Sequence, residues 1–287
     1  MKTIHRILDQ HGALALPGIF DALSARIAES AGCPMGFVSG YSVAATSLGE
    51  PDLGLLTQTE IVAQARRICK SVAIPVLVDA DTGYGNALNT YRTVEELIDV
   101  GAAGCFLEDQ VWPKRCGHMR DKRIVERGEY LERIRAAVEA RAERDFFIVA
   151  RSDAEAVVGL DEAVERVCAA RALGADACFV EAPGSIEQLQ EIGRRTPGPR
   201  VANMIEGGKT PLLPRAQLAK FGFQLILYPL TGLFGAAAAM RHLCDKLMTE
   251  GTSAGAEDKL MDFTSFNELI GVEERLELVR RLQEDNK

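Results

Sequence analysis

The chain has 287 residues, 47% of them hydrophobic, and its 41 acidic and 33 basic residues give a formal net charge of -8. This length is enough to bury a full core, and α/β barrels of this size usually form one domain. The acidic balance and the lack of a lysine and arginine block argue against nucleic acid and membrane surfaces as partners.

The sequence predicts a protein that stays in the cytoplasm. No stretch approaches the roughly 20 apolar residues that a membrane-spanning helix needs. The N-terminal segment carries His5, Arg6 and Asp9 where a secretory signal has an apolar core. Seven cysteines, an odd number spread through apolar runs, are typical of reduced and buried thiols.

Short apolar segments rich in β-branched residues recur along the chain and predict strands. In chain order they are residues 14–16, 36–38, 75–78, 104–107, 146–150, 177–180, 200–202 and 224–227. Between most of them lie amphipathic segments with helical spacing, at residues 57–72, 90–100, 128–143, 160–173 and 214–221. The predicted chain therefore alternates strand and helix.

This alternation sets the expected fold. Continuous apolar strands are buried on both faces, which indicates a parallel sheet in an α/β protein. Eight such units favour a closed (β/α)8 barrel of the TIM type, with an open doubly wound sheet as the alternative. We expect residues 1–250 to form the barrel. Residues 251–287 are expected to form a helical extension that packs on a neighbouring subunit through Phe263, Phe266, Leu269 and Ile270.

Polar residues follow nearly every predicted strand. They are Ser39, Asp79, Asp81, Glu108, Asp109, Arg151, Asp153, Glu181, Asn203 and Glu206, with Asp52 in the long loop after the second strand. Barrel chemistry is built from the loops at the carboxyl ends of the strands. The sequence therefore predicts an active site made of these side chains.

Four of these residues form a predicted cation site, namely Asp52, Asp79, Asp81 and Glu108. Two carboxylates about 5 Å apart repel by about 3 kcal/mol at an effective dielectric of 20, so such a cluster needs a cation. An all-oxygen ligand set favours Mg²⁺ or Mn²⁺ over zinc. The alternative is that these acids cap helices or pair with surface arginines.

The segment 112–120 places one thiol, Cys116, among basic or titratable neighbours. Nearby cations are expected to lower the pKa of that thiol from about 8.5 toward neutrality. The alternatives are an incidental cysteine in a basic surface loop, or half of a zinc site that lacks further ligands at the right spacing. Arg151 follows a five-residue apolar strand. Its guanidinium is expected either to clamp a substrate carboxylate or to pair with Glu181.

The sequence resembles the isocitrate lyase and phosphoenolpyruvate mutase superfamily over nearly its whole length. The resemblance rests on the motifs Val-Asp-Ala-Asp-Thr-Gly at 78–83, Leu-Glu-Asp-Gln at 107–110 and Lys-Arg-Cys-Gly-His at 114–118. Residues 112–114, 203–211 and 266–270 look most like the branch of the petal death protein, 2,3-dimethylmalate lyase and the oxaloacetate acetylhydrolases.

The resemblance implies a role for each candidate residue. It implies that Asp79 anchors Mg²⁺, that Asp52, Asp81 and Glu108 reach the ion mainly through water, and that Cys116 is an acid on a closing loop, tuned by His118. Arg151 and Glu181 then join the catalytic residues. The implied substrate-binding residues are Ser39, Gly40, Tyr41, Lys114, Arg115, Gly117, Asn203 and Thr231. Family members are typically homotetramers that exchange their C-terminal helices, which implies the same here.

The expected activity is that of a Mg²⁺-dependent lyase that cleaves a carbon-carbon bond in a small 2-hydroxy or 2-keto diacid. The substrate is expected to be a 2-alkylmalate such as 2,3-dimethylmalate, or oxaloacetate hydrolysed to oxalate and acetate. Such cleavage leaves a basic enolate that needs a metal and a positioned acid.

Several alternative activities stay open. They are a carboxyphosphoenolpyruvate or phosphonopyruvate mutase, a methylisocitrate lyase and an oxaloacetate decarboxylase. Phe37 and the segment 205–208 depart from the tyrosine and the Thr-Glu-Phe-Gly expected in the tricarboxylate lyases, and Cys116 argues against the phosphonate mutases. A catalytically silent barrel that senses diacids is the non-enzymatic alternative.

Overall fold

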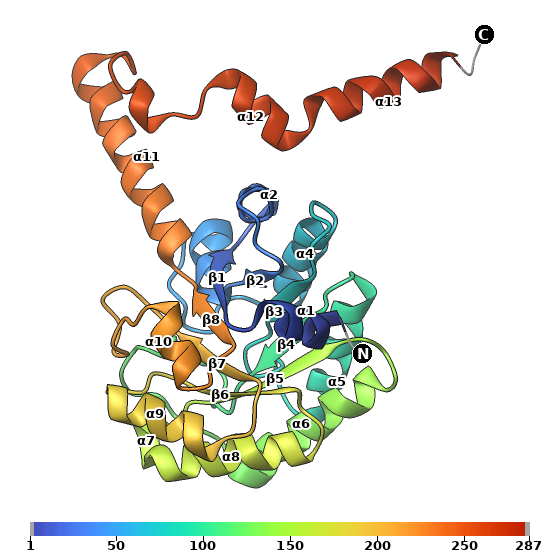
Figure 1. Ribbon diagram of the computed structural model, residues 1–287, viewed down its shortest axis with the longest axis vertical. Coiled ribbons are helices and arrows are strands. Elements are labelled where there is room, and N and C mark those ends of the chain that lie inside the picture. Colours follow the sequence, from blue (N-terminus) through green and yellow to red (C-terminus); the bar gives the residue numbers. More distant parts are fainter. Residues whose placement is uncertain (1–2, 285–287) are drawn as a thin grey trace.

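Eight short apolar strands close into a parallel barrel in the computed structural model, which describes residues 3–284 (Figure 1). The strands are β1 (Leu14–Ile19), β2 (Gly36–Val38), β3 (Val76–Asp79), β4 (Gly104–Leu107), β5 (Phe147–Ser152), β6 (Ala177–Val180), β7 (Arg200–Asn203) and β8 (Leu225–Tyr228). The barrel closes where β1 pairs in parallel with β8, with Leu14 opposite Leu225. The predicted (β/α)8 barrel is therefore confirmed, and the open sheet is excluded.

Helices surround the barrel and connect its strands (Figure 1). They are α1 (Thr3–His11), α2 (Ala22–Ser30), α3 (Gly40–Val43), α4 (Gln58–Cys69), α5 (Ala87–Asp99), α6 (Arg127–Arg141), α7 (Glu155–Val158), α8 (Leu160–Ala172), α9 (Ile186–Arg195) and α10 (Arg215–Lys220). A π-helix, η1 (Ala44–Leu48), continues α3. The five predicted helices correspond to α4, α5, α6, α8 and α10, while α1, α2, α3, α7, α9 and η1 were not among the predicted segments.

Local capping fixes where the helices begin. Thr57 and Glu60 form a capping box at the start of α4, in which each side chain bonds the backbone N–H of the other. Asn86 caps α5 in the same way, and its side chain accepts from the N–H groups of Leu88 and Asn89. These caps mark the ends of the loops that follow β2 and β3, which carry Asp52 and Asp81.

The barrel interior is filled by large apolar side chains. Leu16, Phe37, Leu77, Phe106 and Phe179 belong to one buried cluster, into which α1 inserts its own apolar face at the amino-terminal ends of the strands. Gly104 lets β4 approach β5, because a Cβ there would lie 2.2 Å from the carbonyl oxygen of Phe147. Only the carboxyl-terminal end of the barrel is left for a site.

The C-terminal helices leave the barrel as an arm. They are α11 (Thr231–Glu250), the 3₁₀ turn η2 (Glu257–Lys259), α12 (Phe263–Ile270) and α13 (Val272–Glu284), and Figure 1 shows them projecting away from the strands. The arm exposes large apolar side chains, among them Met248 at 85% and Phe263 at 82%. Arg26 of α2 donates to the carbonyl of Leu269 at 3.2 Å. Among the helices of residues 3–284, none has the length and apolar character to span a membrane.

Candidate active site

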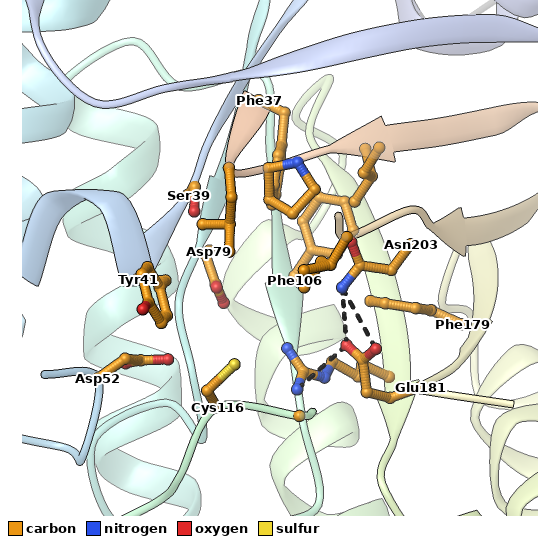
Figure 2. A pocket seen from close by; sticks show the side chains of 16 residues that line it. Phe37, Ser39, Tyr41, Asp52, Asp79, Phe106, Cys116, Phe179, Glu181 and Asn203 are labelled. Atoms are coloured by element: carbon orange, nitrogen blue, oxygen red, sulfur yellow. Dashed lines mark hydrogen bonds and ion pairs between the residues drawn. The ribbon is translucent and has the colours of Figure 1, made fainter. Parts of the chain in front are cut away.

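A cavity lies at the carboxyl-terminal ends of the strands. Figure 2 shows Tyr41, Asp52, Asp79 and Cys116 on one side of it, and Phe106, Phe179, Glu181 and Asn203 on the other. The lining residues are Phe37, Ser39, Tyr41, Asp52, Asp79, Phe106, Cys116, Gly117, Arg151, Phe179, Glu181, Asn203, Ile205, Leu227, Pro229 and Leu230. Nine of the predicted site residues therefore meet in one place.

The four predicted cation-binding carboxylates lie together, although they are not equivalent. Asp79 at the end of β3 and Asp52 line the cavity. Asp81 and Glu108 are buried, with relative exposures of 2% and 1%. Gly40 permits this crowding, because a Cβ there would lie 3.1 Å from Asp79 Oδ2 and 3.5 Å from Asp81 Oδ1. The backbone N–H of Asp81 donates to Asp79 Oδ1 at 3.2 Å.

The cluster carries more negative charge than its protein partners offset. Burial, followed by the charges of Asp79 and Asp52, raises the pKa of Asp81 to about 7 against the opposing effect of Lys114. Burial also raises the pKa of Glu108 well above its ordinary value, although Arg151 opposes it.

A hydrated divalent cation fits this cluster. Glu108 Oε1 is buried without a hydrogen-bond partner, so it is free to accept from water. Among residues 3–284, no three His, Cys, Asp or Glu side chains are grouped to hold a metal ion directly. Mg²⁺ usually keeps several waters and takes only one or two carboxylates from the protein. The arrangement suits an ion that contacts Asp79 and reaches the remaining acids through water.

Lys114 is placed differently from the substrate-binding role that the resemblance implies. Its Nζ lies 2.6 Å from Asp52 Oδ1 and 2.9 Å from Asp81 Oδ1, and the side chain is 3% exposed. Lys114 is not among the residues that line the cavity. Its ammonium group therefore offsets the negative charges of Asp52 and Asp81.

Cys116 lies on the loop between β4 and α6, which is folded over the cavity. An antiparallel bridge between Gln110 and Ile124 closes the base of this loop. The Cys116 N–H donates to the carbonyl of Asp52 at 3.1 Å. Figure 2 shows the Cys116 thiol beside Asp52 at the edge of the cavity. The thiol is thereby brought within the same pocket as Asp79.

The predicted lowering of the thiol pKa is wrong. Burial, and then the negative charge of Asp52, raise the pKa of Cys116 to about 11. The basic neighbours do not compensate, because Lys114 is paired with carboxylates and Arg115 is an exposed side chain near Asp121. A thiol in this setting keeps its proton at neutral pH, which suits an acid better than a nucleophile.

His118 bridges the loop to two strand ends. Its Nε2 lies 3.1 Å from Glu181 Oε1. Its Nδ1 accepts a hydrogen bond of 2.9 Å from the backbone N–H of Lys209. Since Nδ1 accepts, the ring proton of the neutral form is on Nε2, directed at Glu181. The imidazole therefore orients Glu181, and only the backbone N–H of His118 acts on the Cys116 thiol.

Arg151 projects from β5 into a ring of carboxylates. Its Nη2 lies 3.1 Å from Glu108 Oε2 and 3.2 Å from Glu181 Oε2. Its Nε donates to Asp153 Oδ2 at 2.9 Å. The proposed ion pair with Glu181 is thus present, and the guanidinium also lines the cavity. Both of the predicted roles of Arg151 are compatible with this placement.

Glu181 is held as an anion. Although burial opposes ionisation, Arg151 and His118 hold the pKa of Glu181 well below its ordinary range. Asn203 Nδ2 lies 3.2 Å from both of its carboxylate oxygens and donates to them. A carboxylate so strongly stabilised is a poor proton acceptor, so Glu181 acts by orienting its neighbours.

Gly117 lies where the closed loop touches the barrel. A Cβ at this position would lie 2.4 Å from Glu181 Cγ and 2.6 Å from Arg151 Nη2. Only a glycine therefore lets the loop come this close to the strands.

Besides Gly40 and Lys114, two further predicted substrate-binding residues, Arg115 and Thr231, are not among the residues that line the cavity. Arg115 is exposed, and its Nη1 donates to the carbonyl of Arg120 at 3.3 Å. Thr231 is exposed at the start of α11, where its hydroxyl donates to Glu206. Arg115 precedes Cys116 in the sequence and Thr231 follows Leu230, both of which line the cavity. The side chains of Arg115 and Thr231 are themselves exposed to solvent.

The apolar wall of the cavity was largely missed by the sequence analysis. Phe37 and Phe106 pack with ring centroids 4.9 Å apart, and Phe106 packs on Phe179 at 6.1 Å. The Arg151 guanidinium carbon lies 5.5 Å from the Phe179 ring centroid. These rings are the inward-facing residues of β2, β4 and β6, and period-two alternation within a strand was the signal that could have found them.

The comparison with known families covers most of the chain, since residues 4–248 match the phosphoenolpyruvate phosphomutase family. The petal death protein of Dianthus caryophyllus is 48% identical over 277 residues, which cover 96% of this chain and 87% of that protein. The chloroplastic carboxyvinyl-carboxyphosphonate phosphorylmutase of Arabidopsis thaliana is 47% identical over 96% of this chain and 83% of its own length. The 2,3-dimethylmalate lyase of Eubacterium barkeri is 42% identical over 94% and 93%.

Solved structures of related enzymes are also similar to this chain in fold and sequence. Oxaloacetate acetylhydrolase in complex with the inhibitor 3,3-difluorooxalacetate superposes with a TM-score of 0.92 and 33% identity, covering 98% of this chain and 96% of that one. A phosphonopyruvate hydrolase complex with oxalate and Mg²⁺ gives a TM-score of 0.85 and 28% identity, covering 97% and 96%. The chain belongs to the phosphoenolpyruvate mutase family of the isocitrate lyase/phosphoenolpyruvate mutase superfamily.

Proposed function

We propose that this protein is a Mg²⁺-dependent lyase that cleaves a carbon-carbon bond in a small 2-hydroxy or 2-keto diacid. The observation that carries the proposal is that one cavity holds the carboxylate Asp79 and the protonated thiol Cys116, with Arg151 also in its lining. A cation, an acid and an anion-binding group are what cleavage next to a carboxylate requires.

The acidic cluster would hold the metal ion. Mg²⁺ bound there would supply Lewis-acid stabilisation of the negative charge that develops on the substrate. Asp79 would contact the ion, and Asp52, Asp81 and Glu108 would bind its waters. The phosphonopyruvate hydrolase structure with oxalate and Mg²⁺ supports a divalent ion with a small dicarboxylate in this fold. Mn²⁺ would be accepted through the same oxygen ligands.

Cys116 would act as the general acid. When the carbon-carbon bond of a 2-hydroxy diacid breaks, the 2-hydroxyl would lose its proton to solvent and become the carbonyl of the 2-keto product. The electron pair of the broken bond would stay on the carbon next to the departing carboxylate, and the Sγ–H proton of Cys116 would move to that carbon. The thiolate would then regain a proton from solvent. The raised pKa of the thiol keeps this proton available. His118 and Gly117 hold the loop so that the thiol faces the cavity, and the closed loop excludes water.

Gly117→Ala should lower the rate constant for turnover at least tenfold. The added Cβ meets Glu181 and Arg151 at less than 3 Å, so the loop cannot seat Cys116 over the cavity. Steady-state kinetics would measure the effect, with Gly128→Ala as the matched control because nothing lies within 4 Å of a Cβ there. Equal rates for the two variants would contradict the role of the closed loop.

The cavity suits a small diacid with an alkyl substituent. Besides its polar groups, the lining includes an apolar wall made by Phe37, Phe106 and Leu227. A 2-alkylmalate such as 2,3-dimethylmalate presents its alkyl groups to such a wall, in line with the 42% identity to 2,3-dimethylmalate lyase.

Hydrolysis of oxaloacetate to oxalate and acetate is the second candidate activity. The fold matches that of oxaloacetate acetylhydrolase with a TM-score of 0.92 and 33% sequence identity. The two reactions share the metal, the carboxylate clamp and the departing carboxylate, and differ in whether water attacks the substrate. Mutase chemistry on a phosphonate is a third candidate, supported by the 47% identity to the carboxyvinyl-carboxyphosphonate phosphorylmutase.

A substrate panel separates these activities. Purified protein with Mg²⁺ would be assayed against 2,3-dimethylmalate, other 2-alkylmalates, oxaloacetate, methylisocitrate and phosphonopyruvate, with product acids identified by mass spectrometry. We expect the highest kcat/KM for a 2-alkylmalate or for oxaloacetate. Turnover of phosphonopyruvate alone would overturn the lyase proposal.

We further propose that residues 1–250 are the catalytic barrel and that residues 251–287 join subunits of a homotetramer by exchange of C-terminal helices. Residues 285–287 lie outside the described part of the chain. The large apolar side chains that α11 to α13 leave exposed, such as Met248 at 85% and Phe263 at 82%, support this arrangement, since a neighbouring subunit would cover them. The seven free cysteines suit a reducing compartment such as the cytoplasm.

Removal of residues 251–287 should convert the tetramer into smaller species. The reason is that the truncation deletes the exposed apolar residues Phe263, Phe266 and Ile270. Light scattering coupled to size-exclusion chromatography would measure the mass of each protein. A full chain that elutes at the mass of one subunit, at concentrations from micromolar upward, would contradict the proposal.

A further inference from the structure

Lys122 is a buried cation on the far side of the Cys116 loop, and neither the cavity lining nor the acidic cluster includes it. Its side chain is 1% exposed. The ammonium Nζ donates to the carbonyl of Gly117 at 2.6 Å and to Asp153 Oδ1 at 2.7 Å. Lys122 thus ties the residue next to Cys116 to the end of β5.

Asp153 connects this lysine to Arg151. Its Oδ2 accepts from Arg151 Nε at 2.9 Å, and its Oδ1 lies 3.3 Å from Arg151 Nη2. The backbone of Asp153 is fixed independently, because its N–H donates to Asp109 Oδ1 at 2.7 Å. Asp153 therefore offers a rigid, charged anchor that the Cys116 loop and the guanidinium share.

The other basic residues of the loop do not duplicate this contact. Arg115, Arg120 and Arg123 are exposed. Lys114 is buried, but it is directed to Asp52 and Asp81 on the opposite side of the loop. Lys122 is thus the cation that the described structure places between the Gly117 carbonyl and β5.

We propose that Lys122 is a positioning residue, which holds Cys116 over the cavity by binding the Gly117 carbonyl and couples that placement to Arg151 through Asp153. The contact spans the loop end and the strand end, so it forms only when the loop is closed. Loss of the ammonium removes a donor from the Gly117 carbonyl and leaves Asp153 Oδ1 with the longer contact of 3.3 Å to Arg151 Nη2. The loop then opens more often, while Asp153 still holds Arg151.

The test measures how well Cys116 is covered. Lys122→Met removes the ammonium but keeps the length of the side chain, and Arg123→Met removes a neighbouring exposed charge as the matched control. Each protein is treated with iodoacetamide at pH 8.5, and labelling of every cysteine peptide is followed by mass spectrometry. Exposed Cys244 reports reagent activity, and fully buried Cys105 reports global unfolding.

We expect Lys122→Met to label Cys116 at least fivefold faster than wild type, with Cys105 and Cys244 unchanged and Arg123→Met like wild type. The reason is that an open loop exposes the Cys116 side chain, which the closed loop holds in the lining of the cavity, to the reagent. A Cys116 rate within twofold of wild type overturns the proposal. Faster labelling of Cys105 as well also overturns it, because the lysine then serves global stability. If Lys122→Met does not fold, Lys122→Gln carries the same test with the same limits.

The kinetic prediction rests on the proposed function, whereas the labelling result does not. With the substrate identified by the panel, Lys122→Met should lower kcat at least tenfold and change KM by less than threefold, since Arg151 stays on Asp153. A larger rise in KM than fall in kcat would contradict the proposal that Lys122 acts mainly by positioning Cys116. Failure of every substrate would refute the proposed function and leave the labelling test intact.

Discussion

Asp79→Ala is expected to abolish turnover and to weaken Mg²⁺ binding more than about 100-fold, which exceeds the effect of losing an outer-shell partner. Asp79 is the carboxylate that both ends a strand and lines the cavity, close to Asp81 and Gly40. Isothermal titration of Mg²⁺ into chelator-stripped protein would give the affinity directly.

A second variant, Asp81→Asn, distinguishes the loss of a direct metal ligand from the loss of a residue that reaches the ion through water. Asp81→Asn should weaken Mg²⁺ binding by only about 10- to 100-fold, because Asp81 lies behind Asp79 and is paired with Lys114. Circular dichroism would verify that both variants fold. An Asp79→Ala protein that binds Mg²⁺ as tightly as wild type would show that the ion, if bound, has another anchor.

Cys116→Ser is expected to lower kcat at least tenfold while leaving the Mg²⁺ affinity unchanged. A positioned general acid typically contributes about 100- to 10,000-fold, and serine is a far weaker acid than a thiol. The Cys116 side chain lies beside Asp52 at the edge of the cavity, and it is not one of the proposed metal-binding residues. Its replacement should therefore leave the metal site intact. Steady-state kinetics and Mg²⁺ titration on the same preparation would separate the two effects.

Cys244→Ser provides the matched control, because this cysteine is exposed on α11. It should retain the wild-type rate. If Cys116→Ser also turns over at the wild-type rate, the thiol has no part in proton transfer and another group must protonate the product.

The barrel was predictable because its strands are short, apolar and buried on both faces. Each predicted strand from 14–16 to 224–227 overlaps an observed one, and the amphipathic helices matched to within a few residues. The short α3, η1 and α7 were not predictable in the same way. They lack the several turns that make a hydrophobic period visible, and they form where loop residues pack at the barrel mouth.

The position of the site was predictable from polar residues that directly follow apolar strands, such as Asp79, Glu108 and Arg151. Side chains on loops were harder to place. Lys114 and Arg115 are adjacent in the sequence, yet one is buried against carboxylates and the other is exposed. The direction in which a side chain points from an irregular loop depends on tertiary contacts, because such a loop has no repeating hydrophobic period.

The electrostatics of Cys116 could not be read from the sequence. Counting nearby basic residues predicts a lowered pKa, whereas the structure raises it to about 11 through burial and Asp52. Asp52 lies 64 positions earlier in the chain. Burial and partners distant in sequence decide a pKa, and both are properties of the fold.

The most direct test of the whole account is turnover of the best substrate after exhaustive chelation, followed by addition of Mg²⁺. The account predicts that chelation removes at least 99% of the activity, about a 100-fold loss, and that Mg²⁺ restores it. The same recovery is expected with Mn²⁺ to a lesser degree. Full turnover by protein that retains no divalent ion would contradict the central claim that the carboxylates around Asp79 act through a bound cation.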